Sequence, residues 1–148
     1  MTDFIATIYE WFHYNTDLGQ HLRGLDPVDC EDFIGTDLYL RVFLIMIGLN
    51  VCSFMLMYLL IDKLTAKFSS AVSWWITALI TAAINFGIAS SLPRTIDPCP
   101  TLHFDGGDLM LFGAANAWWS LVAFALLTSF PIPRNFSTNC RLTTFWKP

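Results

Sequence analysis

Charged residues are scarce in this sequence, and three long stretches have none. Only 14% of the residues are charged and 55% are hydrophobic, whereas a soluble domain has about a quarter of its residues charged. No Asp, Glu, Lys or Arg occurs in 42–61, 68–93 or 109–133, each of which has 20 residues or more. A chain of this length cannot cover so much apolar surface with its own core. The composition therefore excludes an ordinary soluble domain.

Each charge-free stretch is long enough to cross a lipid bilayer. Roughly 20 apolar residues in a helix span the ~30 Å hydrocarbon layer, and a helix satisfies its own backbone hydrogen bonds there. We therefore predict an all-α membrane protein with a transmembrane domain at 38–133, between an N-terminal segment (1–37) and a tail (134–148). The three predicted transmembrane helices are 38–62, 69–93 and 109–131. Asp37 and Asp108 are placed to cap the first and the third.

Basic residues are unevenly divided between the two sides of such a topology. The loop around Lys63 and Lys67, together with the tail, holds five of the eight basic residues. The N-terminal segment and the loop 93–108 hold eleven of the twelve acidic residues. Cytoplasmic loops are enriched in Lys and Arg. We therefore expect a plasma (inner) membrane location with the N-terminus outside and the C-terminus in the cytoplasm.

The N-terminal segment begins with an amphipathic pattern. Ile5, Ile8 and Phe12 recur at helical spacing over 2–14, while Asp3 and Glu10 lie on another side. This pattern predicts a short interfacial helix on the outer membrane surface. Its acidic polar face makes packing on a partner protein an equal alternative. The glycines and proline that follow break any long helix and predict an ordered loop or docking segment.

The chemistry that many membrane proteins need is missing. Proton relays, pumps and voltage sensors place ionisable side chains inside the membrane, and here even the three histidines lie outside the predicted transmembrane helices. No hydrolase, nucleotide-binding or zinc-protease motif is present. The net charge of −4 does not favour nucleic-acid binding. We expect a protein that is not an enzyme, with no metal site and no cofactor; bound lipid remains an open alternative.

Three asparagines are the strongest polar features of the predicted helices. Asn85 and Asn116 lie at a similar depth below the outer ends of their helices, and Asn50 lies somewhat deeper. Amide side chains at a shared depth hydrogen-bond between helices. One interpretation is that they hold a single bundle together. The other is a polar ring that lines a pore between copies of the chain, and contact with a partner subunit is a third alternative.

Small residues at a spacing of four are typical of closely packed membrane helices. The pairs are Ala78 and Ala82, Ala83 and Gly87, and Gly113 and Ala117. They are the candidate positions for close helix packing.

Two further sets of residues are candidates for contacts of other kinds. Trp118 and Trp119 fall near the middle of the third helix, where a lipid or a cofactor is an alternative to packing. Cys30 and Cys99 both fall on the expected outer side and are a candidate disulfide if that compartment is oxidising.

The excess of apolar surface over reactive groups suggests a role in assembly. The leading hypothesis is a non-enzymatic membrane subunit that anchors or scaffolds a larger multi-subunit complex. The alternative is a homo-oligomeric channel or holin-like pore lined by the asparagines. The expected partners are membrane lipids and either other subunits or copies of the same chain.

Overall fold

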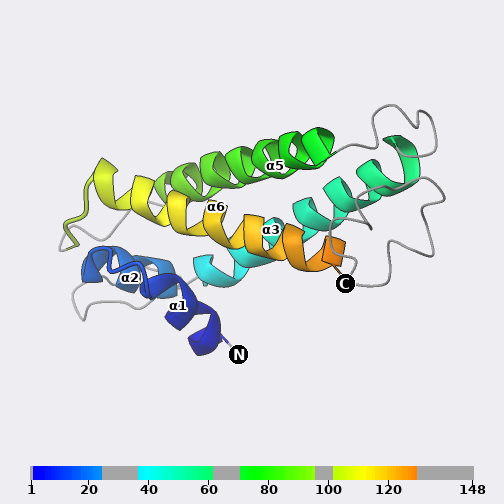
Figure 1. The fold of residues 1–148 in the computed structure, drawn as a ribbon. Coiled ribbons are helices and arrows are strands. Elements are labelled where there is room, and N and C mark those ends of the chain that lie inside the picture. Colours follow the sequence, from blue (N-terminus) through cyan, green and yellow to red (C-terminus); the bar gives the residue numbers. More distant parts are fainter. Residues whose placement is uncertain (1, 25–36, 62–70, 96–101, 130–148) are drawn as a thin grey trace.

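The computed structural model describes residues 2–24, 37–61, 71–95 and 102–129, and these residues are almost entirely helical (Figure 1). The helices in chain order are α1 (Thr2–Glu10), α2 (Thr16–Arg23), α3 (Leu38–Met55), the π-helical turn η1 (Leu56–Ile61), α5 (Ala71–Ser91), the 3₁₀ turn η2 (Leu92–Thr95) and α6 (Gly106–Ser129).

Three helical segments are long and apolar enough to cross a membrane. They are Leu38–Tyr58, Val72–Thr95 and Gly106–Ser129. This confirms the prediction of a helical chain with three such helices, and it indicates a membrane protein. The orientation and the identity of the membrane remain predictions.

Aspartate side chains cap the N-termini of two of the long helices. Asp37 caps α3 as predicted, because its carboxylate accepts a hydrogen bond from the backbone N–H of Leu40 at 3.0 Å. The prediction for the third helix was wrong by three residues. Asp105 caps α6 by accepting from the N–H groups of Gly107 and Asp108, at 2.8 and 3.0 Å. The two glycines before Asp108 are helical, although a pair of glycines is typical of a turn.

The three long helices form one bundle in which α5 and α6 run side by side and α3 packs against both (Figure 1). Gly113 permits the close approach of α5 and α6. A Cβ atom at this position would lie 3.0 Å from the backbone oxygen of Phe86. Any larger residue would push the two helices apart.

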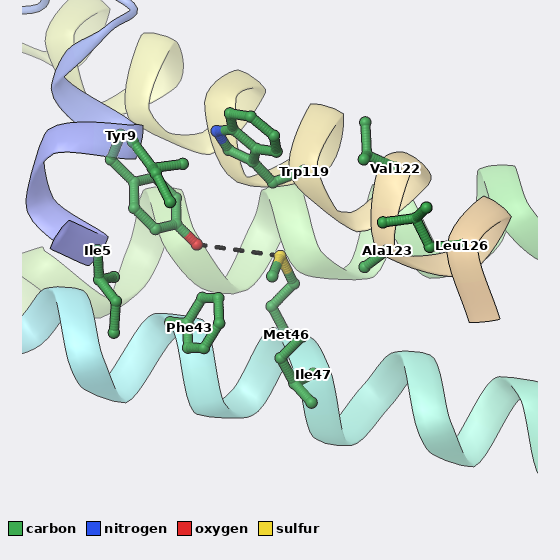
Figure 2. A pocket seen from close by; sticks show the side chains of 10 residues that line it. Ile5, Tyr9, Phe43, Met46, Ile47, Trp119, Val122, Ala123 and Leu126 are labelled. Atoms are coloured by element: carbon green, nitrogen blue, oxygen red, sulfur yellow. Dashed lines mark hydrogen bonds between the residues drawn. The ribbon is translucent and has the colours of Figure 1, made fainter. Parts of the chain in front are cut away.

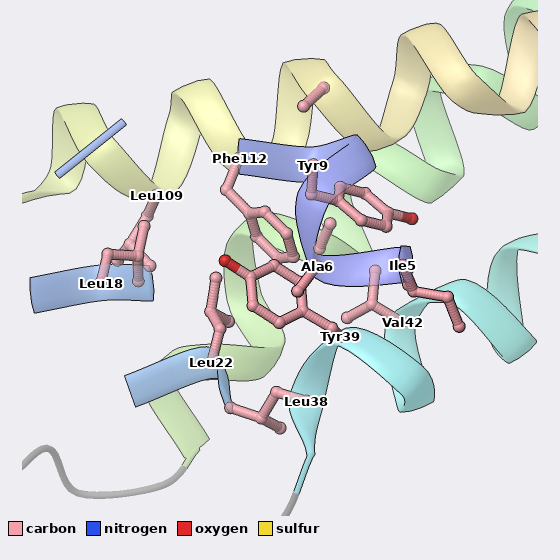
Figure 3. Packing of buried hydrophobic residues seen from close by; sticks show 12 residues of the cluster. Ile5, Ala6, Tyr9, Leu18, Leu22, Leu38, Tyr39, Val42, Leu109 and Phe112 are labelled. Carbon is pink, nitrogen blue, oxygen red and sulfur yellow. The ribbon is translucent and has the colours of Figure 1, made fainter. Parts of the chain in front are cut away.

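The short helices α1 and α2 pack against one end of the bundle, where α3 begins, α5 ends and α6 begins (Figure 1). We call this the cap end. Its core joins side chains from α1, α2, α3, α5 and α6 around three aromatic rings (Figure 3). The ring centroid of Phe112 lies 5.4 Å from that of Tyr9 and 5.9 Å from that of Tyr39.

A second, smaller core lies at the other end of the bundle, which we call the far end. It consists of buried residues from α3, η1, α5 and α6: Phe54, Met57, Tyr58, Trp74, Ala78 and Phe124. In this core α5 contacts α6 through Trp74 and Phe124, whose ring centroids are 5.5 Å apart.

The N-terminal segment differs from the prediction in two respects. The first helix ends at Glu10 rather than near residue 14, and a second helix forms where we predicted a loop. Asn15 caps α2 by accepting from the N–H of Asp17, and Gly24 ends it at a φ of 66°. Gly19 lies within α2, where burial against α1 and α3 offsets its low helix propensity.

Candidate functional site

The three asparagines are brought together inside the bundle, and each is 0% exposed. The amide nitrogens of Asn50 and Asn85 both donate to the hydroxyl of Ser120, at 3.0 and 2.9 Å. Each of these amides also donates to a backbone carbonyl four residues earlier in its own helix. Ser120 on α6 therefore joins α3 to α5 at a single point.

Asn116 extends this polar network toward the cap end. Its amide nitrogen donates to the backbone oxygen of Asn85 at 3.0 Å. Its side-chain oxygen accepts from the hydroxyl of Tyr9 on α1 at 2.6 Å. Burial raises the pKa of Tyr9 far above its usual value, so the phenol stays neutral and remains a donor. One side chain of the membrane domain thus fixes the position of the N-terminal helix.

Hydroxyl and indole groups make similar contacts nearer the far end. The hydroxyl of Thr81 on α5 donates to that of Ser53 on α3 at 2.8 Å. The indole Nε1 of Trp74 donates to the hydroxyl of Thr128 on α6 at 3.2 Å. Every one of these bonds joins two different helices, so the interior polar groups act as cross-links within the chain.

Two buried polar atoms have no hydrogen-bond partner among the described residues: the side-chain oxygen of Asn85 and the indole Nε1 of Trp119. A buried polar group without a partner destabilises a fold by roughly 1–3 kcal/mol. The network is therefore saturated except at one amide oxygen.

At the cap end, charged groups join α1 to α2, and phenolic groups join the turn between these two helices to α3. Arg23 donates to both carboxylate oxygens of Glu10, at 2.8 and 2.7 Å. The hydroxyls of Tyr14 and Tyr39 share a short hydrogen bond. Burial raises the pKa of Tyr14 well above its usual value, so this phenol also stays neutral.

The cap is also joined to the segment that precedes α6. Asn15 donates from its amide nitrogen to the backbone oxygen of His103 at 2.8 Å. The carboxylate of Asp17 accepts from the backbone N–H of His103 at 3.1 Å. His21, which is fully buried, contacts the backbone oxygen of Pro93 through Nε2 at 3.2 Å. Helix α2 and its N-cap thus contact η2, which follows α5, and the segment that precedes α6.

The small residues divide into two groups. Ala78, Ala82 and Gly113 are buried between helices, and Ala117 is half-buried. Ala83 and Gly87 instead lie exposed on the outer side of α5. A Cβ atom at Gly87 would meet nothing within 4 Å.

The two tryptophans of α6 have different surroundings. Trp118 points outward and is 54% exposed. Trp119 lines a half-open pocket of about 160 Å³ between α1, α3 and α6 (Figure 2). The other walls come mainly from Ile5, Tyr9, Phe43, Met46 and Ala123.

The proposed disulfide lies outside the described residues, since neither Cys30 nor Cys99 is among them. Cys52 is an exposed, unbonded thiol within the described part of α3. Among the described residues, no group of three or more His, Cys, Asp or Glu side chains is placed to hold a metal ion.

Sequence reasoning missed two residues of the network, Tyr9 and Ser120. Ser120 lies four residues after Asn116 and therefore on the same face of α6, which is a signal that the sequence contains. Tyr9 lies four residues after Ile5 on the apolar side of α1, but nothing in its spacing names Asn116 as its partner.

Comparison with known protein families, curated proteins and solved structures finds no match to this chain.

Proposed function

We propose that this chain is a non-enzymatic membrane subunit that anchors or scaffolds a larger assembly. The observation that carries the proposal is a division between interior and exterior. Most of the described interior polar side chains hydrogen-bond to groups of the same chain, whereas the outer surface of the long helices is apolar and open. Such a chain offers a surface for packing rather than a group for chemistry.

The outer side of α5 is the face best suited to a partner helix. Large apolar side chains there are about half exposed, namely Val72, Trp75, Ile76, Leu79, Ile80 and Ile84. Beside them lie the small, exposed residues Ala83 and Gly87, and a Cβ atom at Gly87 would meet open space. Small residues let a second helix approach closely, which favours association inside a membrane.

We further propose that α1 lies at the outer membrane interface. It has three faces: Ile5 and Tyr9 are buried against the bundle, and the side chains of Asp3 and Glu10 contact Arg23. The third face is apolar: Phe4 is 70% exposed on it, and Trp11, which directly follows the helix, is 69% exposed. An aromatic face beside membrane helices suits the interface. The division of Lys and Arg along the chain supports an outer location for α1 and a cytoplasmic tail.

The pore alternative is less well supported by the geometry. A pore between copies needs asparagine side chains on an outer surface of the chain. Here Asn50, Asn85 and Asn116 are fully buried and bind groups of the same chain. We therefore propose the subunit role rather than the channel.

Native mass analysis of the tagged chain, extracted from its own membrane in mild detergent, tests the subunit role. We expect a complex heavier than the single chain, and a monomer alone would contradict the proposal. Gly87→Leu should remove the partner while leaving the fold intact. Gly48→Leu is the matched control, since a Cβ atom there also meets nothing within 4 Å. Retention of the partner by both variants would refute the α5 face only.

A further inference from the structure

The pocket beside Trp119 has walls of a single chemical character. Only apolar atoms are exposed on the walls formed by the ten residues that line it. The hydroxyl of Tyr9 bonds Asn116 at 2.6 Å and also lies 3.9 Å from the sulfur of Met46 (Figure 2). The indole Nε1 of Trp119 is buried. A ligand with a polar head would therefore find no hydrogen-bond partner in this pocket.

The size of the pocket sets what can fill it. An apolar cavity of ~150 Å³ in a soluble protein stays free of water and binds benzene. The present pocket, at about 160 Å³, is half-open, and its apolar walls offer a water molecule no hydrogen bond. It has room for about six carbon atoms of hydrocarbon on the same scale. A whole lipid or a folded peptide segment is too large for it.

The position of the pocket indicates the source of the hydrocarbon. Two of its walls, α3 and α6, are long and apolar enough to cross a membrane. Leu126 lines the pocket and is still 56% exposed, so the pocket opens onto the outer surface of α6. Helix α1 closes the opposite side with Ile5 and Ile8. In a bilayer this mouth faces acyl chains.

We infer that the pocket holds part of one hydrocarbon chain of a membrane lipid, clamped between α1, α3 and α6. This hydrocarbon chain fills the space beneath α1 and completes the apolar contact between that helix and the bundle. The same chemistry is found in a phospholipid acyl chain and in the tail of an isoprenoid lipid. The inference is independent of whether the protein is a subunit of a larger assembly.

Native mass spectrometry from nanodiscs tests this inference. The full-length protein is placed in dioleoyl phosphatidylethanolamine and phosphatidylglycerol, with and without a long-tailed benzoquinone, and detergent is stripped in the gas phase. We expect wild type to retain one lipid, whose mass identifies its source. Ala123→Phe and the smaller Ala123→Leu fill the pocket and should lose that lipid. Ala114→Phe, on the exposed side of α6, is the matched control and should retain it.

The folded state of each variant is checked by hydrogen exchange of α5 and α6, which a filled pocket should leave protected. Equal lipid retention by wild type, both Ala123 variants and the control would overturn the inference. Absence of any retained lipid from wild type would also overturn it. A monomeric protein that loses its lipid in the Ala123 variants would support the lipid site while contradicting the subunit role.

Discussion

The cap end and the far end of the bundle differ in which helices form their cores. At the far end, the described core is shared by the long helices and η1 alone. At the cap end, α1 and α2 add a further layer, and Tyr9 from that layer reaches the polar network. Three helices leave a groove between each pair, and α1 packs over the groove between α3 and α6 at one end only.

This difference shows which part of the groove between α3 and α6 depends on its surroundings. Where α1 stops covering the groove, the half-open pocket begins, with Val122, Ala123 and Leu126 on one side. The cap end is therefore sealed by the protein itself. The next stretch of the groove is exposed to whatever lies outside, which in a bilayer is lipid.

The largest expected effect comes from a change at the close contact between α5 and α6, the two helices that run side by side along the bundle. Gly113→Leu would drive a side chain into the backbone of Phe86, where even a Cβ atom lies only 3.0 Å from the carbonyl oxygen. Forcing extra atoms into a packed contact typically costs 1–3 kcal/mol. Because this neighbour is backbone, we expect a loss at the top of that range, about 3 kcal/mol or more. Thermal unfolding in detergent, followed by circular dichroism, measures it.

Gly48→Leu provides the matched control for this change, because its added side chain meets open space. If Gly113→Leu and Gly48→Leu unfolded at the same temperature, the close contact between α5 and α6 would be wrong.

A smaller change separates the two ends. Tyr9→Phe removes the donor to Asn116 and leaves a buried amide oxygen without a partner. A lost partner of this kind costs about 1–3 kcal/mol. We expect α1 to detach more often, so its amide protons should exchange faster while those of the far end, at 71–78, stay protected. Hydrogen exchange read by mass spectrometry measures both regions in one experiment.

Thr7→Ala is the control in α1, since the Thr7 hydroxyl bonds only the backbone oxygen of Asp3 at the surface. Faster exchange throughout the chain in Tyr9→Phe would mean that α1 supports the whole bundle and not the cap end alone.

A third change tests the point where the two ends meet. Ser120→Ala removes one acceptor from the amide nitrogens of both Asn50 and Asn85, and it removes the hydroxyl that donates to the side-chain oxygen of Asn50 at 3.4 Å. Each amide keeps a backbone acceptor in its own helix, so the expected cost is small. Hydrogen bonds between membrane helices average about 0.6 kcal/mol and reach about 1.7. We expect a loss in this range, measured by thermal unfolding in detergent.

Ser129→Ala should have almost no effect, because that hydroxyl is exposed and bonds a carbonyl of its own helix. Equal melting temperatures for Ser120→Ala and Ser129→Ala would show that Ser120 does not join the helices.

The sequence predicted the long helices and less of what joins them. Charge-free length determines a membrane helix, and that signal lies within each segment. The similar depths of Asn85 and Asn116 favour their proximity. They do not predict which atoms form hydrogen bonds, because the rotation of each helix about its axis decides which groups meet. Asn116 thus donates to the backbone oxygen of Asn85 and not to its amide. Helix α2 was missed because its stability comes from burial of Leu18 and Leu22, which a polar, glycine-containing segment does not reveal.

The smallest expected effect concerns the charges that close the cap end. Glu10→Gln keeps the shape of the side chain and removes its charge, so Arg23 loses a bidentate ionic contact. Both side chains are about one third exposed, and exposed ion pairs contribute about 0.2–1 kcal/mol. We expect a loss within that range, together with a weaker dependence of the melting temperature on salt than in wild type. Asp3→Asn should change less, because its carboxylate is 3.7 Å from Arg23 and almost fully exposed. A larger loss for Asp3→Asn than for Glu10→Gln would mean that long-range charge, and not the bidentate contact, joins α1 to α2.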